Sequence, residues 1–502
     1  MATSTLLTRE TEQWLAESAV GSLRRTVRVP SYDRGGLTNS VVHFGAGCFH
    51  RAHQAVYLDE LAERGISAEW GAVGVSLRSG AVKRALAPQG CMYTVLERGP
   101  ECDEARVIGA ITRLCGPDDS ADVRAALVDP QTKLVTLTVT GDGYKLDSES
   151  GQLDEGDPDL LHDLWVPSSP VTLHGHVVNA LRLRRERGLP PFSVVSCDNL
   201  PDNGQTTRNA IVSFARLGDE RLADWIEDNV AFPATVVDRI TPRTTARERA
   251  LLARDYGLRD RWPVVAESFS QWIIEDHFSN ERPPLEEVGV RFVADAGPYE
   301  LVKKRMLNGA HCAIAYVGLL AGHRRIDEAM GDADLRGFIE ALLDHEVIPQ
   351  LPQPPGIDLG NYKRTVVDRF TNPRIGDQLQ RLAARGSTKM PAYLLPSLQA
   401  AVRDGLPRRR LTHAVAAWIV SLRGVDLNGR PIEIEDAMLG TLRPLAREAA
   451  RDCRPLLAER DVFGELGRNG AFAEELRRAV HILEAGGPIM PLSDSRAEPL
   501  AA

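Results

Sequence analysis

One short segment, residues 299–320, combines four polar side chains that together suit the oxidation of an alcohol. They are Glu300, Lys303, Asn308 and His311, and they stand in an otherwise largely apolar stretch. Alcohol oxidation needs a base that takes the hydroxyl proton, and a lysine can serve if burial lowers its pKa from about 10.4 toward neutrality. An asparagine amide can donate hydrogen bonds to the developing alkoxide, and a histidine can bind the substrate oxygen. The alternative interpretation is the charged, solvent-facing side of an amphipathic helix.

The spacing of these residues predicts that they share one face of a helix. A helix turns by ~100° per residue, and Lys303 sets the zero of the scale. Asn308, His311 and Glu300 then fall at about 140°, about 80° and about 60°, within a single arc. Lys304 falls at about 100° in the same arc, so periodicity alone leaves the choice between Lys303 and Lys304 open.

A glycine-rich turn predicts a site for the phosphates of a dinucleotide. The run Gly45-Ala46-Gly47-Cys48-Phe49-His50 follows a predicted strand and opens a predicted helix at 50–64. Glycines there let the backbone approach a pyrophosphate, and we assign Gly45, Gly47 and Phe49 to the cofactor site. Because His50 replaces the third glycine of G-x-G-x-x-G, a plain strand-to-helix turn is the alternative interpretation.

The end of the second predicted strand leaves the choice between NAD and NADP open. An acidic residue at this place normally holds the ribose hydroxyls of the adenosine. Here the strand is followed by Arg78, Ser79, Gly80 and Ala81, without a carboxylate. Arg78 is our candidate cofactor residue, since it could receive a 2′-phosphate together with Ser79 and Lys83. A solvated loop arginine is the alternative.

Two further polar clusters follow predicted strands. Residues 196–204 (SCDNLPDNG) come directly after a strand, where doubly wound sheets bind ligands, although the same residue types also favour a turn. Residues 237–242 (VDRITP) contain Asp238 and Arg239, for which an ion pair that stabilises a loop is the more ordinary interpretation.

The pattern around these motifs predicts an α/β fold with a doubly wound, mostly parallel dinucleotide-binding sheet, followed by a mainly α-helical domain. Strand-like runs alternate with helical segments in the first half, which implies a parallel sheet covered on both faces. The predicted strands are 40–47, 70–77, 133–140 and 193–197. Helical patterns then follow one another at 299–320, 335–346, 376–384, 412–423, 437–450 and 471–485. We therefore predict a Rossmann-type dinucleotide-binding domain at 1–290 and a helical substrate and catalytic domain at 291–502.

Composition excludes several other classes of protein. The chain has 502 residues, 43% of them hydrophobic and 26% charged, which is typical of a globular protein with more than one domain. A net charge of −9 argues against a general nucleic-acid surface. No apolar run approaches the roughly 20 residues of a membrane span, and the N-terminal residues lack the pattern of a secretory signal.

The cysteines and histidines predict neither disulfides nor a metal. Seven cysteines stand at wide spacings without a C-x-x-C pair, which fits reduced thiols in a cytoplasm. His50 and His53 are the remaining metal candidates, but no third ligand is evident near them.

Taken together, these segments resemble the long-chain polyol dehydrogenases, the family of mannitol 2-dehydrogenase and fructuronate reductase. The matching stretches are GAGCFHRAHQAVYLDEL, SCDNLPDNG, FPATVVDRITP, AESFSQWIIEDHF, the K-x-x-x-x-N-x-x-H of Lys303, and GSTKMP at 386–391. The resemblance implies a zinc-independent, NAD(P)-dependent oxidoreductase of two domains that is often a monomer. It implies a polyol and its ketose as substrates, with mannitol and fructose as the first candidates.

The same resemblance implies a role for each candidate residue. It selects Lys303 over Lys304 as the general base. Asn199 and Asn308 would stabilise the alkoxide, His311 would contact the substrate, and Glu300 would pass the proton of the lysine to water. Three further residues match positions that surround the substrate: Asp238, Arg381 and Lys389.

The same residues also allow alternatives to the mannitol-type reaction. Fructuronate carries a carboxylate that needs an extra cation, which Arg381 or Lys389 could supply. Family members that prefer NAD carry an acidic residue near the end of the second strand, where this chain has Ser79, Gly80 and Ala81. A dinucleotide-binding sensor without chemistry is the third hypothesis, and such a protein would be expected to lose its base or its oxyanion donors.

Overall fold

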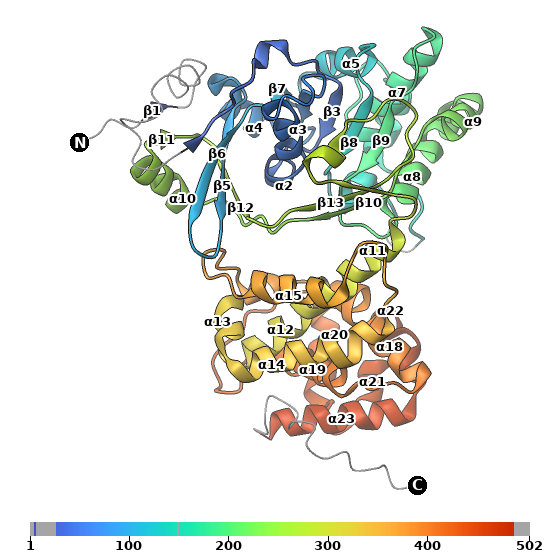
Figure 1. Cartoon of the computed structure of the whole chain (residues 1–502). Coiled ribbons are helices and arrows are strands. Elements are labelled where there is room, and N and C mark those ends of the chain that lie inside the picture. Colours follow the sequence, from blue (N-terminus) through green and yellow to red (C-terminus); the bar gives the residue numbers. More distant parts are fainter. Residues whose placement is uncertain (1–4, 7–26, 148–149, 486–502) are drawn as a thin grey trace. The chain divides into compact units, whose positions relative to one another are not determined.

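The computed structural model describes residues 5–6, 27–147 and 150–485 (Figure 1). The chain divides into two compact units, Met1–Gly297 and Pro298–Ala502, which are described separately below.

A five-stranded parallel sheet forms the centre of the first unit. Its strand order is β7-β4-β3-β8-β9, and its members are β3 (Val41–Phe44), β4 (Ala72–Val75), β7 (Ile111–Cys115), β8 (Leu134–Leu137) and β9 (Ser193–Ser196). The predicted strands at 40–47, 70–77, 133–140 and 193–197 correspond to β3, β4, β8 and β9. Every residue of these four strands is buried, which explains why they stand out in the sequence as continuous runs.

Helices cover both faces of this sheet, which confirms the predicted fold class. Val42 and Phe44 of β3 face a core built with α5 (Ser120–Val128), α7 (Leu173–Glu186) and α8 (Asn203–Gly218). Val41, which points the other way, belongs to a core shared with α3 (Gln54–Glu63) and α4 (Ala81–Leu86). Successive strand residues therefore supply opposite layers, as the two-residue period of a strand requires.

Besides the short pair β1 (Thr5–Leu6) and β11 (Leu258–Arg259), the first unit has two smaller sheets that were not predicted. One has the order β12-β5-β6-β2 and comprises β2 (Val27–Arg28), β5 (Tyr93–Arg98), β6 (Asp103–Ile108) and β12 (Val264–Glu267). The other has the order β10-β13-β14 and comprises β10 (Thr235–Asp238), β13 (Gln271–Glu275) and β14 (Arg291–Val293). Both contain antiparallel pairs, β5 with β6 and β10 with β13.

The prediction of one continuous helix at 50–64 is wrong, because the structure has two helices that are separated at His53. The structure has α2 (Cys48–Ala52) and then α3, with His53 between them at φ −128° and ψ −85°. The His53 ring lies 2.9 Å from the carbonyl oxygen of Gln271 on β13, which holds the broken turn against a neighbouring strand.

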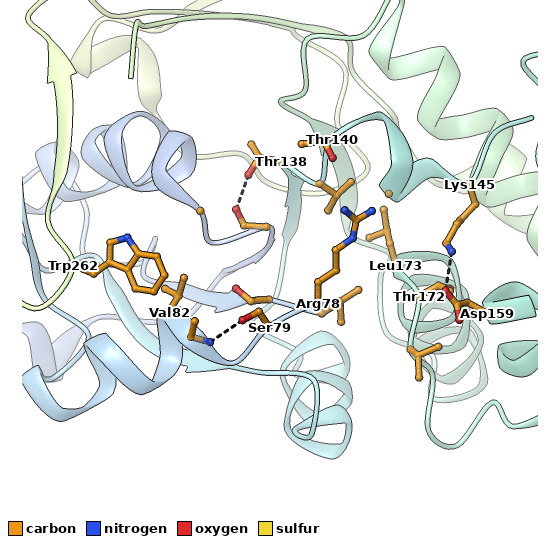
Figure 2. Close-up of a pocket in the computed structure, with 18 residues that line it drawn as sticks. Arg78, Ser79, Val82, Thr138, Thr140, Lys145, Asp159, Thr172, Leu173 and Trp262 are labelled. Atoms are coloured by element: carbon orange, nitrogen blue, oxygen red, sulfur yellow. Dashed lines mark hydrogen bonds and ion pairs between the residues drawn. The ribbon is translucent and has the colours of Figure 1, made fainter. Parts of the chain in front are cut away.

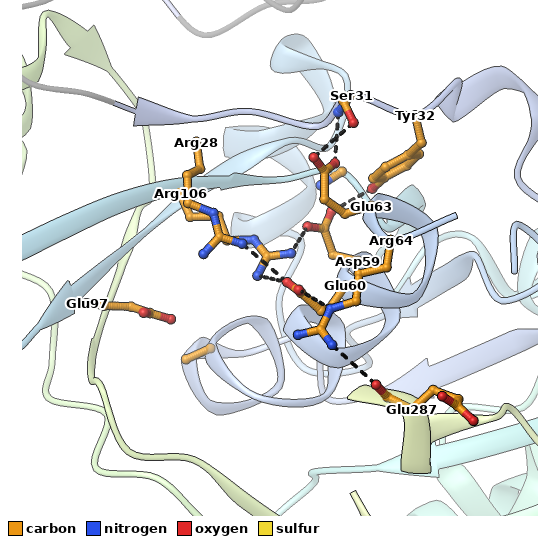
Figure 3. Close-up of polar contacts among 12 residues, drawn as sticks. Arg28, Ser31, Tyr32, Asp59, Glu60, Glu63, Arg64, Glu97, Arg106 and Glu287 are labelled. Atoms are coloured by element: carbon orange, nitrogen blue, oxygen red, sulfur yellow. Dashed lines mark hydrogen bonds and ion pairs between the residues drawn. The ribbon is translucent and has the colours of Figure 1, made fainter. Parts of the chain in front are cut away.

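A polar network anchors α3 to β6 (Figure 3). Arg106 of β6 binds Asp59 at 2.6 Å and Glu60 at 2.5 Å. The Tyr32 hydroxyl and the Gly109 amide also donate to Asp59, at 2.6 and 2.7 Å. Because the buried carboxylate has three donors, the helix that follows the glycine turn is fixed in position.

The second unit is built from helices, as predicted. Its helices include α12 (Gly309–Leu320), α14 (Ala333–Leu342), α15 (Leu359–Phe370), α16 (Leu379–Ala383), α18 (Leu395–Asp404), α19 (Arg409–Ser421), α20 (Leu439–Glu448) and α23 (Gly470–Glu484). Every residue of α12 except His311 is buried, so this helix forms the centre of the unit. Within the described residues, no helix combines the length and the apolar character that crossing a membrane requires.

Candidate active site

A cavity of about 510 Å³ opens at the carboxyl ends of three neighbouring parallel strands (Figure 2). Gly45 and Gly47 follow β3, residues 76–79 follow β4, and residues 138–140 follow β8; all of these line the cavity. The carboxyl edge of a doubly wound sheet is where such folds bind ligands. The structure therefore brings Gly45, Gly47 and Arg78, three of the residues assigned to the cofactor site, to the wall of one cavity.

In the glycine turn that lines this cavity, the position at which only a glycine fits is Gly45. Its φ is +95°, and a Cβ there would overlap the carbonyl oxygen of Thr138, which directly follows the neighbouring strand β8. The Thr138 hydroxyl donates to the Gly45 carbonyl at 2.7 Å (Figure 2). At Gly47, by contrast, the nearest atom to a Cβ would be 3.7 Å away. The turn is thus packed tightly on its protein side and open on its cavity side, which fits a phosphate-binding backbone.

Two of the predicted cofactor residues lie elsewhere. Phe49 is not among the described residues that line the cavity, and its ring stacks on His53 at a centroid distance of 5.1 Å. Lys83 is bound to Asp119 at 2.5 Å and does not line the cavity either. Arg78 does line it, with its side chain 68% exposed and 3.8 Å from Asp142.

Asp198 organises the cavity wall, a role that the sequence analysis missed. Its carboxylate accepts from the amides of Val139 and Thr140 at 2.9 and 3.0 Å and from the Tyr144 hydroxyl at 2.9 Å. Burial raises the pKa of this carboxyl. Thr140 has a φ of +66°, so the carboxylate stabilises a strained turn after β8. An aspartate two residues after the end of β9 was the available signal, but it could not be distinguished from a residue that favours a turn. The neighbouring Asn199 is exposed.

Beneath the glycine turn lies a pair of stacked histidines. The rings of His43 and His50 are 3.3 Å apart between centroids and inclined by 11°. Both are fully buried, and burial lowers the pKa of His43 to about 3 and that of His50 well below its ordinary value. The His43 ring also lies 2.8 Å from the Thr138 hydroxyl that holds Gly45. Neutral imidazoles therefore support the turn.

We expect this pair to make the protein less stable in mild acid. The folded state keeps both rings neutral, whereas the unfolded chain protonates them below about pH 6.5, so stability is retained above that pH and lost as the pH falls. Each such histidine contributes a slope of about 1.4 kcal/mol per pH unit between the two pKa values. Urea unfolding from pH 7 to pH 5 should show a shallower dependence in His50→Phe than in the wild type. An identical slope would contradict this account.

In the second unit, the helix predicted at 299–320 contains an extra residue. It consists of α11 (Gly297–Val302), a π-helical turn at Lys303–Asn308, and α12. The Gly309 amide donates to the carbonyl of Lys304, five residues earlier instead of four. The predicted angle between Lys303 and Asn308 is therefore wrong, because in a π-turn residue i+5 lies over residue i. The two side chains start from the same side of the helix, and π-turns of this kind are frequent at functional sites.

The structure also distinguishes the two lysines. Lys303 is buried, with 8% of its surface exposed. The ammonium of Lys304 forms an ion pair with Glu300 at 2.7 Å. A protonated amine held by a carboxylate has no lone pair with which to accept a proton. Glu300 therefore contacts Lys304 in this structure, and Lys304 is the poorer candidate for a base.

His311 is held in a fixed orientation by an aromatic ring. Its imidazole stacks on Phe370 of α15 at 4.4 Å between centroids, with an angle of 24° between the planes. It is also the one residue of α12 that is not buried. A ring fixed in this way can present a nitrogen in a constant direction.

Arg381 and Lys389, the predicted substrate residues of the second unit, bind protein groups. Arg381 forms an ion pair with Asp377, with 2.7 Å between Nε and Oδ1. The Lys389 ammonium donates to the carbonyls of Leu382 and Arg381 at 2.8 and 3.3 Å, and burial lowers its pKa.

Asp238 and Arg239 have different surroundings at the end of β10. Asp238 is buried. Arg239 forms an ion pair with Glu97 at 2.6 Å and donates to the carbonyls of Ala52 and Glu267. The interpretation as a structural ion pair therefore holds for the arginine of this motif.

The residues described by the structure contain no group of three or more His, Cys, Asp or Glu side chains that could hold a metal ion. Of the two histidines considered above, His53 lies beside the Gln271 carbonyl oxygen, and His50 is stacked on His43.

Two protein-family models together match nearly the whole chain. The family model for the mannitol dehydrogenase Rossmann domain matches residues 39–287, and that for the mannitol dehydrogenase C-terminal domain matches residues 295–484. The mannitol 2-dehydrogenase of Aspergillus fumigatus is 40% identical over 471 residues, which are 92% of this chain and 94% of the relative.

Two solved structures are also similar to this chain over nearly its whole length. The Pseudomonas fluorescens mannitol 2-dehydrogenase ternary complex with NAD and D-mannitol has a TM-score of 0.83 and 38% identity, covering 96% of this chain and 98% of that one. D-sorbitol dehydrogenase in substrate-free form has a TM-score of 0.87 and 34% identity, with the same coverage. The chain therefore belongs to the mannitol dehydrogenase family.

Proposed function

We propose that the protein is a polyol dehydrogenase that interconverts a polyol and its ketose with a nicotinamide dinucleotide, with mannitol and fructose as the preferred pair. The observation that supports the proposal is the π-helical turn that begins at the buried Lys303 and ends at Asn308. Family membership supports it, as does the similar structure that contains NAD and D-mannitol.

The cavity of the first unit is our proposed cofactor site. The glycine turn leaves its cavity side open, as the approach of a pyrophosphate requires. When bound, a nicotinamide dinucleotide accepts the hydride of the alcohol carbon and returns it in the reverse reaction.

The remaining chemistry falls to side chains, and the proposal needs no metal. The neutral amine of Lys303 takes the hydroxyl proton during oxidation and returns it during reduction. The amide of Asn308 donates to the developing alkoxide, and the resemblance assigns Asn199 the same role. His311, held by Phe370, contacts the substrate oxygen. For Glu300 we keep the proton relay as a proposal, although its carboxylate is paired with Lys304. For Asp238, Arg381 and Lys389, substrate contacts likewise remain proposals from the resemblance.

A matrix of initial rates tests this function. It crosses NADH and NADPH with fructose, sorbose, fructuronate, tagatose and xylulose. Turnover of fructose to mannitol supports the mannitol-type reaction. Turnover of fructose to sorbitol, or of sorbose alone, moves the chain toward a sorbitol-type reaction, and turnover of fructuronate alone moves it to the uronate branch. NADH binding without turnover of any ketose would contradict the proposal.

The choice of cofactor can be tested at Gly80 and Ala81. We expect the double variant Gly80→Asp with Ala81→Asp to lower kcat/KM for NADPH relative to that for NADH by about tenfold or more. The two carboxylates would repel the negatively charged 2′-phosphate of NADPH. A Cβ at Gly80 would meet only the tip of the Arg84 side chain, which can move. Gly80→Asn with Ala81→Asn is the uncharged control. An NADPH-to-NADH ratio that stays unchanged in the aspartate variant would remove the argument.

We also propose a cytoplasmic monomer. The resemblance supports the monomer, and the free thiols of all seven cysteines suit a reducing compartment.

A further inference from the structure

Arg51 is an arginine of α2 whose side chain is completely buried, with 0% of its surface exposed. Its Nε donates to the Gly47 carbonyl at 3.2 Å, and its Nη1 donates to the Trp262 carbonyl at 2.5 Å. The guanidinium also lies 5.2 Å from the centre of the Tyr93 ring and 3.8 Å from the Cys48 sulfur.

Both of these carbonyls belong to residues that line the cavity. Gly47 is the open position of the glycine turn, and Trp262 forms the wall beside Val82 (Figure 2). The planar fork of one arginine thus joins two walls of the cavity that are more than two hundred residues apart in sequence.

The charge of Arg51 has no direct counter-ion among the described residues, where no ion pair involves it. Asp260 lies in the same buried region, but its carboxylate accepts from the Gln89 side chain and from the amides of Thr94 and Trp262. Burial raises the pKa of Asp260, while these three donors and the charge of Arg51 act in the opposite direction. A buried cation that forms no ion pair is stabilised when an anion comes close to it.

We propose that Arg51 is a positioning residue for the pyrophosphate of the dinucleotide. It fixes the Gly47 turn and the Trp262 wall, and its buried charge attracts the phosphates from behind the turn. This charge matters because α2 has only five residues, too few for a strong helix dipole. The inference rests on the cofactor class of the proposed function.

The test measures binding without turnover. NADH, ADP-ribose and adenosine are titrated against the wild type, Arg51→Lys and Arg51→Met, with NADH followed by its fluorescence and the other two as competitors. In Arg51→Met we expect Kd for NADH and ADP-ribose to rise by about tenfold or more, the worth of a charged hydrogen bond. Kd for adenosine, which carries no phosphate, should change by less than about twofold. Arg51→Lys keeps the positive charge but lacks the planar guanidinium. Its Kd values for NADH and ADP-ribose should lie between those of the wild type and those of Arg51→Met.

Arg184 offers a matched control. It is also completely buried in the first unit and donates to the carbonyls of Pro190, Leu127, Asp129 and Thr132, none of which lines the cavity. Arg184→Lys should lower the melting temperature as Arg51→Lys does but leave all three affinities unchanged.

The outcomes separate the inference from the proposed function. A wild type that binds no NADH overturns both. A wild type that binds NADH, with Arg51 variants of unchanged affinity, overturns only the role of Arg51. Equal weakening of adenosine and ADP-ribose would show a purely structural effect and would also overturn it. Because Arg51→Lys preserves charge and approximate length, it remains available if Arg51→Met does not fold.

Discussion

Replacing Lys303 by methionine should lower kcat for polyol oxidation by a factor of about 10³, because the reaction loses its general base. Kd for NADH should stay within about twofold of the wild type, since no hydrogen bond of the glycine turn changes. Lys304→Met is the matched control, because Lys304 is already paired with Glu300. We expect it to change kcat by less than about tenfold. Steady-state rates and fluorescence titration measure the two quantities.

The pH profile gives the same prediction a second readout. Oxidation in the wild type should rise with pH, because only the neutral amine accepts the hydroxyl proton. Lys303→Met should lose this dependence, whereas Lys304→Met should retain it. If Lys303→Met reduces every ketose at the wild-type rate near neutral pH, another group is the base.

Replacing Gly45 by alanine should damage both stability and cofactor binding. The added Cβ would overlap the Thr138 carbonyl oxygen, and a φ of +95° is strained for any residue except glycine. Such backbone strain costs about 1–3 kcal/mol, and the overlap adds to it. We expect the free energy of unfolding to fall by about 3 kcal/mol and Kd for NADH to rise by about a hundredfold.

Gly47→Ala separates these two effects. Its Cβ would point into open space, with the nearest atom at 3.7 Å, and its φ of −78° suits any residue. Stability should therefore change by less than about 1 kcal/mol, while NADH still binds more weakly because the methyl group occupies the phosphate side. Urea unfolding and fluorescence titration measure both variants. A Gly45→Ala protein with wild-type stability and affinity would refute this reading of the turn.

The parallel sheet was predictable because its strands are buried on both faces. β3, β4, β8 and β9 stand out as apolar runs, and the intervening helices follow from the crossovers that parallel strands need. The antiparallel strands β5 and β6 were missed, since their burial follows tertiary contacts that a local pattern does not show.

The residue types of the candidate site could be proposed from the sequence, but their geometry could not. Lys303, Asn308 and His311 were identified by spacing, but nothing in the letters between them marks the extra residue of the π-turn. Periodicity also could not separate Lys303 from Lys304, because the deciding ion pair depends on side-chain direction. Phe49 and Lys83 were assigned by nearness in sequence, yet the ring of one stacks on His53 and the amine of the other binds Asp119.

The π-turn also limits how this segment can change length. Deleting one residue between Lys304 and Leu307 would restore regular α-helical hydrogen bonds and leave α12 in its orientation, because the π-turn accommodates one extra residue. A deletion within α12 would instead rotate the residues that follow by ~100°, and since every residue of α12 except His311 is buried, no rotated register could keep the same packing. Homologous chains should therefore align through α12 without gaps, whereas a gap of one residue in the π-turn would leave the packing of α12 intact and change the angle between Lys303 and Asn308.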